Sequence, residues 1–189
     1  MAKEILFLDE VIIENHEDSN LEKKILYCLD HEKKLNNKVI ASNMGGFQTP
    51  NITDEFICKN LVKKIGTALT KEYDLKNIKI RLDNLWINEN KKNDFNIPHN
   101  HPYSNFSGVY YVSVPKEGGE IMFLRNDPSV GGSNNFKFLK TSNFFTSCTI
   151  KPKKNMLLIF SSHISHMVKP HMENMNRISV SFNVVLSKN

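Results

Sequence analysis

The amino-acid sequence predicts an α+β protein in which N-terminal helices support a mainly β antiparallel sandwich or barrel. Apolar residues recur at helical spacing in the first part of the chain, and from Ile78 onward short β-type runs alternate with turn residues. A chain of 189 residues is long enough to bury one sizeable core. We therefore expect a single domain, with helical support over residues 1–77 and the β core over residues 78–189.

Two helices are expected before the β region. An apolar run, Ile5–Leu8, comes first, and Ser19 then acts as an N-cap for a helix from Asn20 to about Leu35. Thr53 opens a second helix that stops near Tyr73. Their apolar stripes are core positions, formed by Leu21, Ile25, Leu26 and Leu29 in the first helix and by Ile57, Leu61, Ile65 and Leu69 in the second.

Seven strands are expected after the helices. They are Ile78–Asn88, Ser107–Val114, Glu120–Arg125, Cys148–Ile150, Met156–Phe160, Met167–Val168 and Arg177–Leu186. Gly118 and Gly119 are expected to make a tight turn between adjacent strands. Two stretches are irregular: Ser42–Pro50, and a long Asn-, Ser- and Gly-rich loop over Asn126–Asn143, which is a candidate lid.

Charge and cysteine content argue against several classes of protein. The formal net charge is +5, but the lysines are scattered and form no concentrated basic stripe, so nucleic-acid binding is not expected. Three widely spaced cysteines suggest neither a disulfide framework nor a thiolate zinc site. The N-terminus has no signal architecture, and no apolar run approaches the ~20 residues that span a bilayer. We expect a cytoplasmic protein, and its wealth of Asn, Lys and Ile is typical of an AT-rich genome such as that of a phage or a marine bacterium.

The run Ile97 to Val114, IPHNHPYSNFSGVYYVSV, contains the first candidate metal ligands. His99 and His101 are two residues apart, and an extended backbone would place both imidazoles on one face, about 6–7 Å apart along the strand. A histidine pair alone is more often exposed or hydrogen-bonded than metal-bound. His166 follows the apolar run MLLIF, where a barrel mouth would bring it against the pair. His163 and His171 lie in the same segment, and spacing alone does not choose among the three.

Arg177 begins a strand with two different faces. One face is polar and the other apolar; the polar face holds Arg177, Ser179, Ser181 and Asn183, and the apolar face holds Ile178, Val180, Phe182 and Val184. Taken alone, such a strand is equally consistent with a polar face in water. With a metal nearby, the same pattern predicts a polar interior.

These motifs together resemble the iron(II)/2-oxoglutarate-dependent oxygenases, and most closely a small group of them from bacteria and phages. The resemblance covers roughly residues 78–186 and is carried by HNHPYSNFSGVYYVSVP, the GGE at 118–120, NMLLIF, the HMV at 166–168 and the RISVSFN at 177–183. It implies a double-stranded β-helix, or jelly roll, with supporting N-terminal helices. It also implies Fe(II) as the metal and 2-oxoglutarate as cosubstrate.

The resemblance further implies roles for individual residues. His99 would be the first iron ligand and His166 the distal one, and Arg177, assisted by Ser179, would pair with the remote carboxylate of 2-oxoglutarate. The eleven-residue interval from His166 to Arg177 suits the family, and His163 is kept in reserve. A guanidinium matches a carboxylate with two parallel hydrogen bonds, which lysine does not reproduce.

The sequence departs from the broad family pattern at position 101. Most such oxygenases use two histidines and one carboxylate, and the acidic residue would fall where this chain has His101. An imidazole there makes the site about one unit more positive. Three alternatives follow: His101 is itself the third ligand, Asp94 swings in from upstream, or water or an anion takes the position. We favour His101 because it has the spacing of the motif.

Other polar residues are candidates for the cosubstrate pocket. Asn88 and Trp86 lie on a strand that leads toward the site, although a lone tryptophan on a strand is more often core. Tyr110 and Tyr111 point to opposite faces of their strand, so one can pack while the other reaches 2-oxoglutarate. We take Asn88 and Tyr111 as the candidates, although the sequence does not decide between the tyrosines, and Tyr103 is an alternative.

Three functions from different classes follow. The leading one is an Fe(II)- and 2-oxoglutarate-dependent dioxygenase that couples oxidative decarboxylation of 2-oxoglutarate to hydroxylation of an unidentified substrate. A second is a three-histidine zinc hydrolase or lyase, which has no general need for the Arg177 clamp. A third is a non-catalytic jelly-roll or cupin-like binding protein. Cupins usually place a glutamate four or five residues after the histidine pair, where this chain has Asn105 and Phe106.

Overall fold

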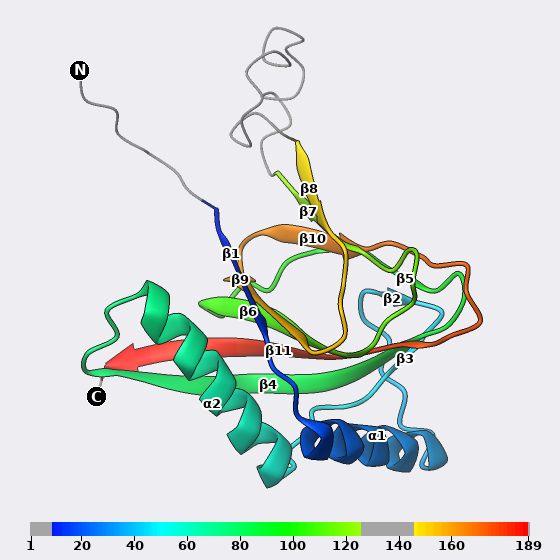
Figure 1. Ribbon diagram of the computed structural model, residues 1–189, viewed down its shortest axis with the longest axis horizontal. Coiled ribbons are helices and arrows are strands. Elements are labelled where there is room, and N and C mark those ends of the chain that lie inside the picture. The colour runs from blue at the N-terminus through cyan, green and yellow to red at the C-terminus, as the bar shows by residue number, and fades with distance from the viewer. Residues whose placement is uncertain (1–8, 126–145, 189) are drawn as a thin grey trace, which may run out of the picture.

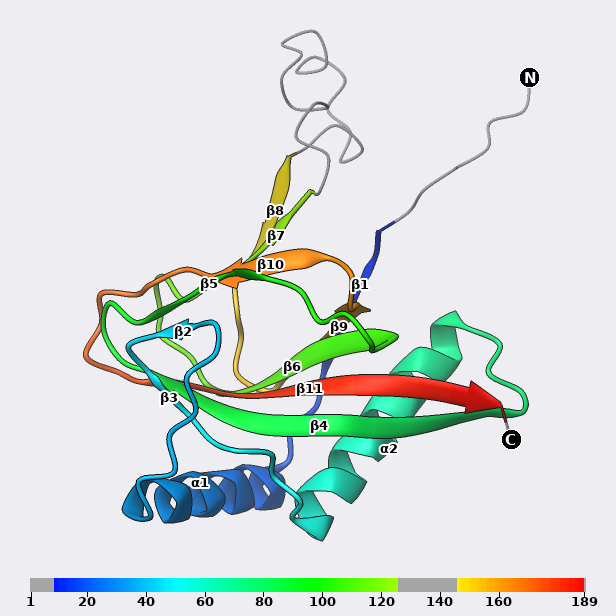
Figure 2. The ribbon, with the colours of Figure 1, turned by 180° about the vertical axis from the view of Figure 1, so that it is seen from behind.

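Two antiparallel sheets face each other, and two helices lie on the outer side of the larger sheet (Figures 1 and 2). The protein is seen here in a computed structural model that describes residues 9–125 and 146–188. This arrangement confirms the predicted jelly-roll core with supporting N-terminal helices. The apolar run Ile5–Leu8 and the candidate lid Asn126–Asn143 lie outside the described residues.

Helix α1 (Ser19–Lys34) begins behind an aspartate. The Asp18 carboxylate accepts the backbone N–H of Leu21 at 3.0 Å and so acts as the N-cap. The expectation that Ser19 caps this helix is wrong by one residue, because Ser19 is already the first helical residue.

Helix α2 (Glu55–Glu72) uses the same device. Asp54, not Thr53, is its N-cap, and its carboxylate accepts the N–H of Ile57 at 3.1 Å. The two caps also join the helices, since Lys24 of α1 pairs with Asp54 at 2.8 Å and Lys64 of α2 pairs with the α1 cap at 3.1 Å. Neither described helix combines the length and the apolar character needed to cross a membrane.

The larger sheet has six strands, and its outer face carries the helices. Its order is β1 (Val11–Asn15), β9 (Met156–Ser161), β6 (Phe106–Ser113), β11 (Arg177–Lys188), β4 (Ile78–Asn90) and β3 (Phe47–Gln48). Apolar side chains of β4, β6, β9 and β11 form one core with the α1 and α2 stripes. The expectation that Leu26 belongs to the α1 stripe is wrong, because its side chain is 38% exposed. Figure 2 shows α1 beneath this sheet and α2 crossing behind β4 and β11.

The smaller sheet has five strands and closes the other side of the interior. Its order is β2 (Asn43–Met44), β5 (Phe95–His99), β10 (Ser165–Val168), β7 (Ile121–Leu124) and β8 (Ser147–Ile150). A second apolar core fills part of the space between the sheets; it includes Tyr111, Ile121, Phe123, Leu158 and Phe160. Apolar side chains therefore occupy the face of the larger sheet that carries the helices and part of the space between the sheets. Polar residues line the rest of that space.

Four strands were not expected from the sequence: β1, β2, β3 and β5. β2 and β3 have two residues each, too few to show an alternating pattern. β5 contains Pro98 and two polar residues, which weaken a strand signal. The segment before residue 78 thus supplies strands to both sheets as well as the helices.

Strand β11 turns its polar face inward, as a polar interior requires. Arg177 is 2% exposed and Ser179 1%, and both lie between β4 and β6 in the middle of the larger sheet. The opposite face holds Val180 and Phe182, which belong to the core shared with the helices. The alternative of a polar face in water is therefore wrong.

Gly108 in β6 allows two neighbouring strands to approach closely. A Cβ atom at this position would lie 2.3 Å from Cζ of Phe182 and 2.4 Å from the carbonyl oxygen of Leu158. One of these atoms is backbone, so it cannot move without disturbing the sheet. The glycine of the SGVYY run is thus required by packing.

We expect Gly108→Ala to lower the free energy of unfolding by about 1–3 kcal/mol, since it overpacks the core. Urea denaturation measures the change. Gly66→Ala in α2 is the matched control, because its Cβ would meet only Cδ1 of Ile80 at 3.7 Å and alanine favours a helix. Equal stability of the two variants would contradict this account of Gly108.

Candidate active site

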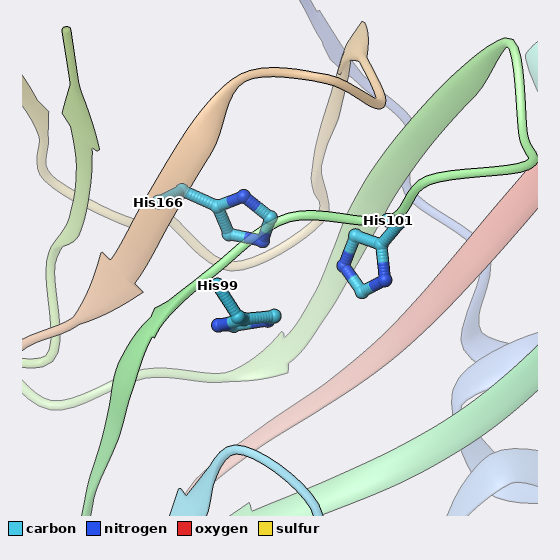
Figure 3. Close-up of side chains that lie close together, drawn as sticks. All are labelled: His99, His101 and His166. Atoms are coloured by element: carbon cyan, nitrogen blue, oxygen red, sulfur yellow. The ribbon is translucent and has the colours of Figure 1, made fainter. Parts of the chain in front are cut away.

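Three histidines from two antiparallel strands meet at one point. His99 ends β5 and lies directly opposite His166 of β10, and His101 follows two residues after His99. One potential ligand atom from each histidine lies within 4.8 Å of the other two. Figure 3 shows the three imidazoles around a common space. Such a separation allows one metal ion to be bound by all three rings.

Backbone carbonyls orient two of the rings. His99 Nδ1 lies 2.8 Å from the carbonyl oxygen of Ile97, and His166 Nδ1 lies 3.0 Å from that of Ile164. In a neutral ring the protonated Nδ1 donates to the carbonyl, which leaves the lone pair of Nε2 for a metal. A histidine ligand held through its second nitrogen is the common arrangement at metal sites.

Burial keeps these rings in the form that binds metals. It lowers the pKa of His99, and together with the neighbouring His99 it lowers the pKa of His101 to about 4 and that of His166 to about 3. The rings are then neutral at pH 7. A metal would displace few protons on binding them.

The other residues considered as metal ligands lie elsewhere. Asp94 accepts the backbone N–H of Lys91 at 2.7 Å, and within the described ranges no carboxylate joins the histidine group. His163 lies on the surface, where it contacts Asp9 at 3.1 Å. His171 is buried but faces the carbonyl oxygen of Asn90 at 3.2 Å.

Arg177 is held rigidly at the far side of the interior. Its Nε donates to the carbonyl oxygen of Gly119 at 3.1 Å, and its Nη1 donates to the hydroxyl of Ser179 at 3.0 Å and to Asn90 Oδ1 at 3.4 Å. The guanidinium also lies 4.9 Å from the ring centroid of Tyr111. A buried cation with only neutral partners favours an anionic ligand.

The structure separates the roles of the two tyrosines. Tyr110 faces the helices, and its hydroxyl donates to the carbonyl oxygen of His16 at 2.9 Å. Tyr111 faces the interior beneath Arg177, and its buried hydroxyl has no hydrogen-bond partner among the described residues. Tyr103 is 99% exposed. Of the two neighbouring tyrosines, Tyr111 is therefore the one that lies on the Arg177 side of the sheet.

Asn88 has a second buried polar atom without a partner. Its Nδ2 donates to the Ser181 hydroxyl at 3.0 Å, whereas its Oδ1 is unpaired within the described part of the chain. The two amide atoms are interchangeable by a flip, after which Ser181 would donate to Oδ1 and the N–H groups would be free. Unpaired polar atoms at Asn88 and Tyr111 fit a polar ligand beside Arg177.

A narrow cavity of about 40 Å³ joins these parts. It is lined by the three histidines, by Asn88 and by Arg177 with Ser179. A wider cleft of about 460 Å³ adjoins the histidines, and Trp86, His99 and His101 line both spaces. Trp86 is thus part of the site and not of the apolar core.

Sequence reasoning missed four residues that position the site. Ser42 lies 3.3 Å from His99 Nε2 and accepts a hydrogen bond from Asn96 Nδ2 at 3.0 Å. Asn90 and the carbonyl group of Gly119 hold Arg177. The GGE run marked Gly119 as a turn only, and no pattern in the sequence pairs Ser42 with a histidine 57 residues away.

Comparisons with known proteins agree with this geometry. Residues 84–183 match the family model described as "Putative 2OG-Fe(II) oxygenase". Among curated proteins, none matches the sequence.

Solved structures are similar in fold. A Pseudomonas putida prolyl-4-hydroxylase matches with a TM-score of 0.60 at 12% identity over 92% of this chain and 91% of that one. HygX from Streptomyces hygroscopicus, with nickel, 2-oxoglutarate and hygromycin B bound, matches with a TM-score of 0.63 at 11% identity over 93% and 82%.

A 2OG-Fe(II) oxygenase family oxidoreductase from Burkholderia pseudomallei has a TM-score of 0.46 and 16% identity, with 70% of this chain covered. The match extends over only 51% of that protein, so this chain spans about half its length. The family model covers more than half of the 189 residues, including all three histidines and Arg177. The chain belongs to the 2OG-Fe(II) oxygenase family.

Proposed function

We propose that the protein is an Fe(II)- and 2-oxoglutarate-dependent dioxygenase that hydroxylates an unidentified substrate. The observation that carries the proposal is one cavity lined by three neutral imidazoles and by a buried arginine. Iron(II) with 2-oxoglutarate supplies dioxygen activation and oxidative decarboxylation when bound. The protein binds both, orients the cosubstrate and restricts the access of water.

His99, His101 and His166 would hold the metal. Nδ1 of His99 and of His166 is occupied by a carbonyl oxygen, which directs Nε2 toward the ion. These three protein ligands would leave coordination positions on the ion open to other groups. The set also suits a neutral-imidazole zinc site, and this keeps zinc hydrolysis as the rival reaction.

Arg177, Ser179, Tyr111 and Asn88 would hold 2-oxoglutarate. The guanidinium pairs with the remote carboxylate, and the Ser179 hydroxyl, which already contacts Nη1, assists. The Tyr111 hydroxyl and the Asn88 amide would supply hydrogen bonds that the described residues leave unmade. A hydrolytic zinc enzyme or a non-catalytic jelly roll has no general need for this clamp.

His101 is the ligand that departs from the family pattern, and its replacement tests it. We expect His101→Ala to weaken Fe(II) binding about tenfold or more, and His101→Asp to retain binding, because a carboxylate at this position completes the usual ligand set. Anaerobic metal titration measures both. If His101→Ala binds Fe(II) as wild type does, His101 is not a ligand.

The proposed function as a whole is tested by calorimetric titration of 2-oxoglutarate. Under anaerobic conditions the cosubstrate should bind tightly to the Fe(II)-loaded protein and much more weakly to the metal-free protein, since it would contact both metal and Arg177. Succinate formation in air should then require Fe(II). Failure to bind 2-oxoglutarate combined with tight binding of Zn(II) would favour the hydrolase or the non-catalytic protein.

A reducing compartment such as the cytoplasm fits the proposal. Cys28, Cys58 and Cys148 are all free thiols, as expected where disulfides do not form. Fe(II) is also maintained more readily under reducing conditions.

A further inference from the structure

The wider cleft next to His101 differs in chemistry from the cavity around Arg177. It has a volume of about 460 Å³, which is within the range of small-molecule sites. No lysine, arginine, aspartate or glutamate is among the described residues that line it. Its polar groups are instead amides and hydroxyls, apart from the two histidines that it shares with the proposed metal site.

Some of the amide groups that line the cleft already form hydrogen bonds within the protein. Asn183 Nδ2 donates to Asn84 Oδ1 at 2.7 Å, and Asn183 Oδ1 accepts from the Ser107 hydroxyl at 2.7 Å. These bonds fix the Asn84 side chain with its Nδ2 unengaged by the described residues. Asn84 thus presents a positioned donor at the cleft.

Gln48 presents a complete amide group. It is 9% exposed, lies on β3 beside Asn88 of β4, and lines the cleft. Its side chain makes no hydrogen bond to any described residue, although an amide both donates and accepts. The buried polar atoms without a partner do not include its Oε1 or Nε2, so both amide atoms are open to the cleft and available to a ligand.

Trp86 supplies an aromatic surface beside the metal site. Its ring centroid lies 5.8 Å from that of His101, with the planes inclined by 51°. Both side chains line the cleft. A ring or flat apolar group lying against Trp86 would therefore be held next to the proposed metal.

We propose that this cleft is the primary-substrate site and that it takes an uncharged substrate that hydrogen-bonds to Gln48 and Asn84 and packs against Trp86. The inference rests on the proposed function for the identity of the neighbouring metal site. An ionic group entering the cleft would lose part of its hydration and meet no oppositely charged side chain among the described residues that line it, whereas a neutral amide or hydroxyl finds both donors and acceptors. The same difference favours the cavity around Arg177 over the cleft as the site of 2-oxoglutarate.

The chain offers a direct measurement, because Trp86 is its only tryptophan. Benzamide, benzylammonium and benzoate have the same ring and differ in charge, so their titration against Trp86 fluorescence compares neutral, cationic and anionic ligands. The benzoate titration is repeated with Arg177→Met, so that binding of benzoate at Arg177 is recognised and set aside. We expect benzamide to bind at least about tenfold more tightly than either ion.

A charge substitution sharpens the test. Gln48→Glu should reverse the order so that benzylammonium binds more tightly than benzamide, since it places a carboxylate in the cleft. Asn60→Asp, on the exposed face of α2, adds the same charge elsewhere and should leave the order unchanged.

Equal or tighter binding of an ion by the wild type, no response of Trp86 to any probe, or an unchanged order in Gln48→Glu would overturn the inference. The readout needs neither metal nor turnover. A failure here is therefore distinct from a failure of 2-oxoglutarate to bind the Fe(II)-loaded protein, which would overturn the proposed function.

Discussion

Replacing Arg177 with methionine is expected to weaken 2-oxoglutarate binding by about 2–4 kcal/mol, or roughly 30- to 1,000-fold. The guanidinium is buried and fixed by Gly119, Ser179 and Asn90. Among the described residues that line the cavity, no other lysine or arginine could replace it. Arg177→Lys should also lose about tenfold or more, because an ammonium does not reproduce two parallel hydrogen bonds. Calorimetric titration of 2-oxoglutarate into the metal-loaded variants measures both effects.

Arg81→Met is the matched control for this prediction. Arg81 lies on β4, the strand that pairs with β11, but its side chain is 58% exposed and contacts Asp83. It should bind 2-oxoglutarate as wild type does. If Arg177→Met retains wild-type affinity while it remains folded by circular dichroism, Arg177 does not bind the cosubstrate.

His166→Ala is expected to reduce Fe(II) affinity about 100-fold or more. The ring is 5% exposed, lies opposite His99 across the β5–β10 pair, and is oriented by the carbonyl group of Ile164. Its removal leaves two histidines and no nearby carboxylate among the described residues. Competition with a chromogenic chelator under anaerobic conditions measures the loss.

His163→Ala provides a control three residues away. His163 lies on the surface against Asp9, and its replacement should leave Fe(II) affinity unchanged. Equal losses in the two variants would mean that the segment, and not the His166 imidazole, determines metal binding. A wild-type affinity in His166→Ala would remove this residue from the ligand set.

The long, periodic elements of the fold were predictable from the sequence. The stripes of α1 and α2 and the alternation in β11 extend over enough residues to determine type and face. The short elements were not predictable. β2 and β3 have two residues each, and their hydrogen bonds come from β5 and β4, respectively. The N-caps were misplaced by one residue because serine, threonine and aspartate all cap helices.

The histidine group was largely predictable, and its surroundings were not. Once β5 is known to pair with β10, the HxH motif and the distal histidine imply that His99 lies opposite His166. The choice of Tyr111 over Tyr110 depends on which face meets the helices, and only the packed structure establishes this. Ser42, Asn90 and Gln48 come from segments without a motif, and tertiary contact alone brings them to the site.

The central claim is that three imidazoles and Arg177 together bind one iron and one 2-oxoglutarate. Fe(II) and 2-oxoglutarate are added anaerobically to the metal-free protein, and the visible charge-transfer absorption of the chelate is recorded. We predict that it appears in wild type and in His163→Ala, and that it is lost in His166→Ala and strongly reduced in Arg177→Ala. Absence of this absorption in wild-type protein that binds Zn(II) tightly would contradict the account.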